Sequence, residues 1–62
     1  MRLVHRFTDG DHPVELYQNT PNTFKVVYGN HSRRGLSYEE AAREYGQCVF
    51  HSLACADKME LK

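Results

Sequence analysis

The segment GLSYEEAAREY, residues 35–45, constrains the fold most, because several independent signals in it mark the start of a helix. Ser37 is followed three residues later by Glu40, which is the spacing of a capping box, where each side chain bonds the other residue's backbone N–H. The acidic pair in the first turn is favoured by the helix dipole. We therefore predict one helix over about residues 37–58, preceded by strands and turns.

Three segments ahead of the helix have the composition and alternation of strands, at about residues 2–7, 14–18 and 23–28. Asp9-Gly10 marks a turn after the first, and a cluster of turn formers around Pro21 separates the second from the third. The sequence therefore predicts a single α+β domain. In it, a three-stranded antiparallel sheet in chain order packs on one C-terminal helix.

The predicted helix carries an apolar stripe. At 100° per residue its members lie within about 70° of one direction; they are Tyr38, Ala41, Ala42, Tyr45, Cys48, Val49, Ser52, Cys55, Ala56 and Met59. Residues on the opposite side, Glu44 among them, are expected to face solvent. The strand residues expected to pack against the stripe are Leu3, Phe7, Val14, Leu16, Phe24, Val26 and Tyr28.

Size and charge narrow the classes of function. A chain of 62 residues forms one small core and often gains stability from a partner or from self-association. Its eight basic and eight acidic residues cancel, so no global field directs it to nucleic acid or to an acidic membrane. No long apolar run is present, and we expect no membrane association. Cys48 and Cys55 are interpreted as two small buried hydrophobic residues in a reducing compartment, which predicts a cytoplasmic protein; an intermolecular disulfide and metal ligation are the alternatives.

Catalytic and metal-binding patterns are weak. Cys48, His51 and Cys55 have a suggestive spacing, but one helix cannot wrap a tetrahedral ion with ligands seven residues apart. The turn at residues 9–12 holds two carboxylates and an imidazole, far short of a calcium loop, and is read as a hairpin turn with solvated charges. We expect no catalytic residue, no cofactor and no metal site.

One aromatic residue does not fit the apolar stripe. Phe50 points away from the stripe centre, with Gly46 and Leu53 on the same flank. A glycine lets another backbone approach closely, while the two large side chains supply contact area. This pattern predicts a protein-binding surface or a homodimer through the helix, and Tyr17 on the second strand is a further candidate contact.

A basic segment lies between the third strand and the helix. Residues 29–35 are expected to form a polar loop that presents His31, Arg33 and Arg34. Together with Lys25, these side chains are candidates for holding an anion or a nucleic-acid backbone beside a helix N-terminus. Nucleic-acid binding is therefore the alternative to protein binding.

The start of the helix resembles that of the plant ethylene-response-factor DNA-binding domains. The resemblance implies a three-stranded sheet followed by one helix, with DNA read by the sheet. The chain contains no tryptophan, whereas that family places tryptophans on its sheet. The matching positions are capping and packing residues, namely Ser37, Glu39, Glu40, Ala41, Ala42 and Tyr45.

Residues 24–29 and 51–56 look like segments of small phage and prophage accessory proteins. That resemblance implies a module that binds and redirects a host protein. The sequence as a whole therefore predicts a small non-catalytic protein-binding or regulatory module, with a DNA-binding domain as the alternative.

Overall fold

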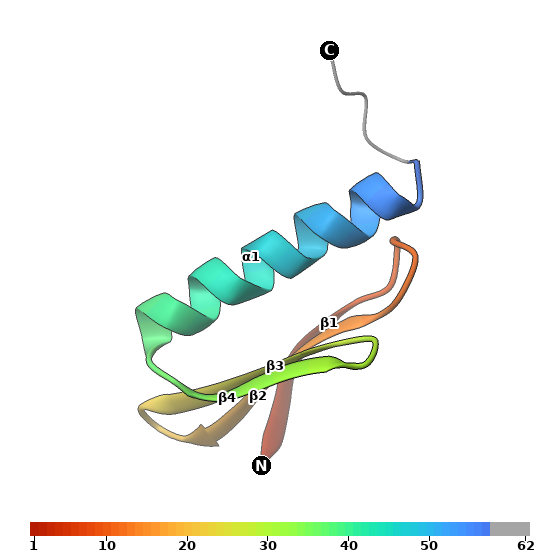
Figure 1. Ribbon diagram of the computed structural model, residues 1–62. Coiled ribbons are helices and arrows are strands. Elements are labelled where there is room, and N and C mark those ends of the chain that lie inside the picture. Colours follow the sequence, from red (N-terminus) through yellow and green to blue (C-terminus); the bar gives the residue numbers. More distant parts are fainter. Residues whose placement is uncertain (58–62) are drawn as a thin grey trace.

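The computed structural model describes residues 1–57 and contains four strands and one helix. They are β1 (Arg2–Phe7), β2 (Val14–Thr20), β3 (Thr23–Tyr28), β4 (His31–Leu36) and α1 (Tyr38–Cys55). The strands form one antiparallel sheet in chain order, and α1 lies across one of its faces (Figure 1). The predicted α+β class and the order of the first three strands are confirmed.

The fourth strand corrects the sequence analysis. The predicted polar loop of residues 29–35 is a tight turn followed by β4, which pairs with β3. Only Leu36 in β4 is buried, so the strand lacks the apolar alternation by which the others are recognised. Gly29 has φ +57°, a left-handed conformation that suits the turn between β3 and β4.

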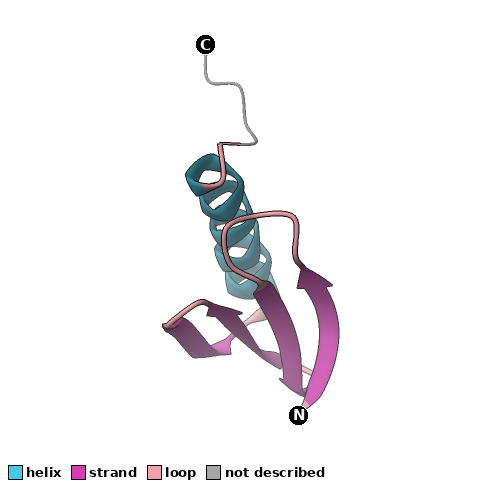
Figure 2. Ribbon diagram, turned by 90° about the vertical axis from the view of Figure 1, so that its right-hand side faces the viewer, coloured by secondary structure: helices cyan, strands magenta, loops and turns pink. Residues whose placement is uncertain are grey.

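The core lies between α1 and the face of the sheet that carries Val14 and Val26, both fully buried. Leu36, Ala41 and Cys48 complete the buried apolar set. Around it pack partly buried residues that the sequence analysis assigned to this interface, namely Phe7, Leu16, Phe24, Tyr28, Tyr45 and Val49. The other face of the sheet carries no further layer among the described elements (Figure 2).

Leu3 was wrongly assigned to the core, since it is 46% exposed. The register between β1 and β2 shifts between Leu3 and His5, because a bulge places Leu3 opposite Tyr17 and His5 opposite Leu16. An extra residue in one strand reverses the facing of the residues beyond it. Leu3 therefore lies on the face away from the helix.

The helix begins as predicted. Ser37 is the N-cap: its Oγ accepts from the N–H of Glu40 at 3.2 Å, and Glu40 Oε1 accepts from the Ser37 N–H at 3.0 Å. The bond from the Ser37 backbone is the main reason why the pKa of Glu40 is lowered. Tyr38 is 75% exposed, and Ala42 and Cys55 are exposed too, so the buried stripe is narrower than predicted. The helix ends at Cys55, and the predicted positions Lys58 and Met59 lie outside the described residues.

The turn between β1 and β2 is anchored to the C-terminal half of α1. The Asp11 N–H donates to the carbonyl of Ser52 at 3.1 Å. Ser52 Oγ is fully buried and lies 3.0 Å from Asp11 Oδ1 and 2.9 Å from the His12 carbonyl. Tyr28 donates its hydroxyl to the same Asp11 oxygen at 2.8 Å. Asp11 is exposed, as expected for this turn, and its carboxylate in addition joins sheet, turn and helix.

Candidate functional site

The first candidate surface lies on the side of α1 away from the core. Phe50 is 62% exposed, whereas Gly46 and Leu53 are partly buried. A Cβ built on Gly46 meets no atom within 4 Å, so the backbone at this point is open to an incoming chain. We call Gly46, Phe50 and Leu53 the outer flank. The structure thus brings together three of the four residues predicted to bind a partner.

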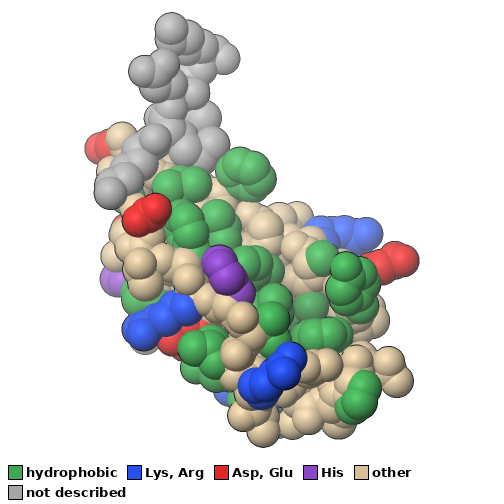
Figure 3. All heavy atoms as spheres, turned by 180° about the vertical axis from the view of Figure 1, so that it is seen from behind, with side chains coloured by type: hydrophobic (Ala, Val, Ile, Leu, Met, Phe, Trp, Pro, Cys, Tyr) green, Lys and Arg blue, Asp and Glu red, His purple; other side chains and the backbone are tan. Residues whose placement is uncertain are grey.

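Hydrophobic side chains are also visible on the surface beyond the outer flank. On the side of the molecule that carries β1, they gather in a broken band with charged side chains mainly around it (Figure 3). Leu3 and Val4 of β1 are 46% and 43% exposed. Apolar atoms form more than half of the accessible surface of ordinary folded proteins, so single exposed side chains of this kind are normal.

Tyr17, the fourth predicted contact, lies on the face of the sheet without a helix. We call this the open sheet face; its members are Leu3, Arg6, Glu15, Tyr17, Lys25, Val27, Ser32 and Arg34, by strand register and alternation. Tyr17 donates its hydroxyl to Glu15 Oε1 at 3.0 Å, and this bond is the main cause of the raised pKa of Tyr17. Tyr17 therefore does not share a surface with Phe50.

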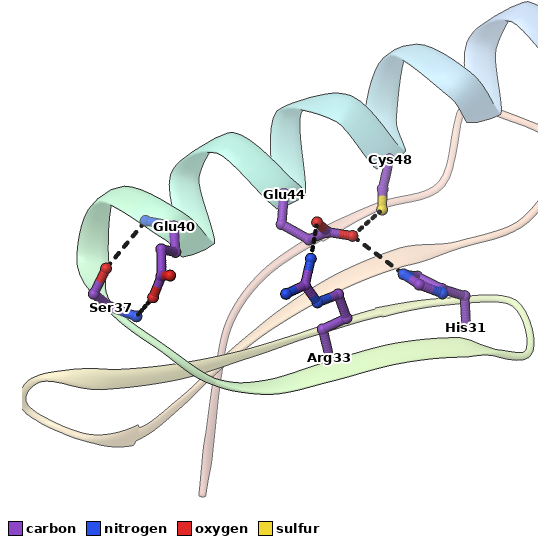
Figure 4. Close-up of polar contacts among 6 residues, drawn as sticks. All are labelled: His31, Arg33, Ser37, Glu40, Glu44 and Cys48. Carbon is purple, nitrogen blue, oxygen red and sulfur yellow. Dashed lines mark hydrogen bonds and ion pairs between the residues drawn. The ribbon is translucent and has the colours of Figure 1, made fainter.

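The predicted anion-binding residues are also divided between two faces. His31 and Arg33 lie on the helix side, where they hold the carboxylate of Glu44: His31 Nε2 is 3.1 Å from Oε2 and Arg33 Nη1 is 3.2 Å from Oε1 (Figure 4). Lys25 and Arg34 belong to the open sheet face. His31 and Arg33 therefore already have the carboxylate of Glu44 as a partner within the chain.

Glu44 was predicted to face solvent, and this was wrong, because its side chain is only 15% exposed. The prediction failed because β4 was not foreseen, and β4 supplies the His31 and Arg33 side chains that cover this carboxylate. The Cys48 thiol lies next to it, with Sγ 3.7 Å from Glu44 Oε2. Burial, together with this carboxylate, raises the pKa of Cys48 and disfavours the reactive thiolate.

His51 and Cys55 form the one remaining pair of reactive groups that the sequence analysis considered. Cys55 Sγ lies 3.4 Å from His51 Nε2, and both residues are exposed at the end of α1. His51 also borders an open hollow, together with Tyr28, His31, Gln47 and Cys48. Within residues 1–57 no three His, Cys, Asp or Glu side chains are grouped so that they could hold a metal ion.

The sequence analysis missed the network around Asp11 and Ser52. Hydrogen bonds, the one from Tyr28 foremost, lower the pKa of Asp11. Burial of Tyr28, together with the hydrogen bond that its hydroxyl donates to Asp11, raises the pKa of Tyr28 to about 12. The one available signal was a serine in an otherwise apolar stripe, since a buried hydroxyl needs a hydrogen-bond partner. This network stabilises the fold and leaves Ser52 inaccessible as a nucleophile.

Comparison with protein-family models, with curated proteins and with solved structures finds no match to this chain. No helix within the described part of the chain is both long and apolar enough to cross a membrane.

Proposed function

We propose that this protein is a small non-catalytic binding module that acts on another protein through the outer flank of α1. The observation that carries the proposal is an aromatic side chain, Phe50, 62% exposed beside an open glycine backbone on a face of α1 that the sheet does not use. Large aromatic side chains in contact with a partner supply most of the binding energy of many interfaces. Gly46 lets the partner approach the helix closely.

The arrangement of the reactive side chains supports a non-catalytic role. Ser52 is buried in contact with Asp11, and Glu44 is held by His31 and Arg33 of β4. Tyr45 OH lies 2.6 Å from His5 Nδ1, which ties the helix to β1. In each case a group that could act as nucleophile, acid or base instead joins two elements of the fold. Catalysis requires a nucleophile and a base within hydrogen-bond reach, in a pocket that excludes water. We therefore do not propose an enzymatic activity.

The setting we propose is the cytoplasm, with a host protein as the class of partner. Cys48 and Cys55 are both free thiols, which suits a reducing compartment. The resemblance to phage and prophage accessory proteins motivates the partner class.

Site-specific photo-cross-linking tests the proposed surface. p-Benzoylphenylalanine is placed at position 50 or, as a matched control on the same helix, at the exposed position of Tyr38. We expect position 50 to cross-link to a defined protein and position 38 not to. The partner is then purified, and we expect Phe50→Ser to weaken its binding at least tenfold while Tyr38→Ser leaves it unchanged. Equal effects of the two substitutions would refute the outer flank as the binding surface.

Nucleic-acid binding is a second candidate function, supported by the charge on the open sheet face. Arg6, Lys25 and Arg34 lie on it, and Glu15 is its only acidic residue. Glu15 pairs with Arg6 at 3.1 Å, which leaves two cations for phosphate contacts. Because phosphate binding releases condensed counterions, affinity for duplex DNA would fall steeply with salt.

A double substitution and a single control substitution separate this function from protein binding. Lys25→Ala with Arg34→Ala should abolish DNA binding, whereas Arg33→Ala, which removes a cation already paired with Glu44, should change it little. Affinity for duplex DNA tighter than about micromolar at physiological salt, lost in the first variant, would make nucleic acid the preferred partner. Salt-independent or undetectable binding would remove this candidate.

A further inference from the structure

The charges of this chain are unevenly distributed, although they cancel in total. Within the described residues, Asp9 and Asp11 lie in the turn between β1 and β2, and three glutamates lie on α1. The open sheet face, in contrast, holds three cations and a single carboxylate, that of Glu15. Arg6 already pairs with Glu15 at 3.1 Å. The open sheet face is therefore positively charged on a chain whose formal net charge is zero.

One row of residues on this face places an aromatic ring beside the two remaining cations. Tyr17 of β2 is the register partner of Lys25 of β3, and Arg34 of β4 lies on the far side of β3. Neither Lys25 nor Arg34 forms an ion pair with another described residue. Neighbouring strands are about 4.8 Å apart, so the two cations lie roughly 5 and 10 Å across the sheet from Tyr17. We call these three residues the cross-strand row.

We propose that the cross-strand row binds single-stranded nucleic acid, with a base stacked on Tyr17 and the adjoining phosphates at Lys25 and Arg34. This inference rests on the second candidate function and names the form of nucleic acid. Aromatic side chains within a cationic surface bind single strands with little dependence on sequence, because every base has a π-face. Tyr17 is partly buried, and the bond from its hydroxyl to Glu15 restrains the ring on the sheet. The ring is thus held in place before a base arrives.

The width of the sheet favours a single strand over a duplex. The open sheet face belongs to four strands and carries no further layer among the described elements (Figure 2). Four strand backbones span roughly 14 Å, whereas the major groove of DNA is about 12 Å wide and admits a helix or a two-stranded ribbon. A duplex therefore contacts this face through its phosphates alone. Its bases stay stacked on one another, and Tyr17 gains no contact from them.

Fluorescence anisotropy with labelled DNA tests the stacked base. The probes are a single strand of mixed sequence, about 16 nucleotides long, and the same strand annealed to its complement. We expect the single strand to bind at least about tenfold more tightly than the duplex. Tyr17→Ile keeps an apolar residue suited to a strand and should weaken single-strand binding about tenfold. Tyr17→Phe keeps the ring without the bond to Glu15, and its affinity should stay within about threefold of the wild type.

The salt dependence tests the phosphate contacts. For single strands, the logarithm of the binding constant falls with the logarithm of salt concentration by about 0.7 for each phosphate contact, so two contacts predict a slope of about −1.4. Lys25→Ala and Arg34→Ala should each reduce this slope by about 0.7. Arg33→Ala is the matched control on β4, because its side chain pairs with Glu44, and it should leave the slope unchanged.

Three results would overturn the inference. Equal affinity for single strand and duplex would leave nucleic-acid binding standing and exclude the stacked base, as would a Tyr17→Ile variant that is folded by circular dichroism and binds as tightly as the wild type. Polyglutamate that binds with the same affinity and salt slope as the single strand would show that the face recognises negative charge alone. Failure to bind either DNA would remove the second candidate function itself. The cross-linking experiment at position 50 decides the outer flank separately.

Discussion

Replacing Gly10 by alanine and replacing Gly46 by alanine should have opposite effects on stability. Only Gly10 lies in the contact between the β1–β2 turn and α1. A Cβ on Gly10 would lie 1.8 Å from Ser52 Oγ and 2.8 Å from the Ser52 carbonyl carbon, so the turn must move away from the helix. That movement breaks the bond from Asp11 N–H to the Ser52 carbonyl, the bond from His12 N–H to Ser52 Oγ, and the bond that the Ser52 hydroxyl donates to Asp11 Oδ1 or the His12 carbonyl. At about 1 kcal/mol for each bond, Gly10→Ala should cost about 3 kcal/mol. A domain of this size has only about 3–5 kcal/mol in total.

Gly46→Ala is the matched control, because its Cβ meets no atom and alanine is the better helix former. It should stabilise the protein by about 0.5–1 kcal/mol. Urea unfolding is followed by far-ultraviolet circular dichroism at low micromolar concentration, where self-association is negligible. Gly10→Ala should also lower the melting temperature by about 12–24 °C. A Gly10→Ala variant within 0.5 kcal/mol of the wild type would refute the described contact between turn and helix.

Four further substitutions test the rest of the fold. Val26→Asp places a charge at a fully buried position and should abolish the cooperative melt seen by circular dichroism. Glu44→Gln should cost about 1 kcal/mol, since the side chains of its partners His31 and Arg33 are more than half exposed, and should speed amide exchange in β4 more than in β1. Asp11 has a lowered pKa, so its carboxylate stabilises the fold above the ordinary value of 3.8, and this stability is lost as the pH falls through the lowered value. Asp11→Asn should flatten that acid limb in urea titrations at several pH values. The pKa of Tyr28 is raised to about 12 from 10.0, so the stability that it contributes is lost as the pH rises between these values, and Tyr28→Phe should reduce the loss.

The helix and three strands were predictable because local signals specify them. The capping box at Ser37 depends on residues three apart, and the alternation in β3 shows which residues face the core. β4 was missed because its residues on the helix side, His31 and Arg33, are polar. They contact the helix through Glu44 and do not bury apolar area against it. A polar strand of this kind cannot be told from a loop without knowledge of the helix beside it.

The candidate surfaces were predictable to a similar extent. The position of Phe50 follows from the helical period, so the outer flank could be found from the sequence. The bulge that moves Leu3 to the open sheet face left no mark in the pattern of apolar residues. The bond between Asp11 and Ser52 joins residues far apart in the sequence, and only the packing of turn on helix creates it.

The most direct test of the central claim is ¹⁹F NMR of protein labelled with fluorophenylalanine. The chain has three phenylalanines, and Phe7 and Phe24 pack against the core whereas Phe50 is exposed. We predict that the Phe50 resonance shifts as the protein concentration is raised to 1 mM, or on addition of the cross-linked partner in purified form, while the Phe7 and Phe24 resonances keep their positions. A Phe50 resonance that stays unshifted in both titrations would contradict the claim that the outer flank of α1 is a binding surface.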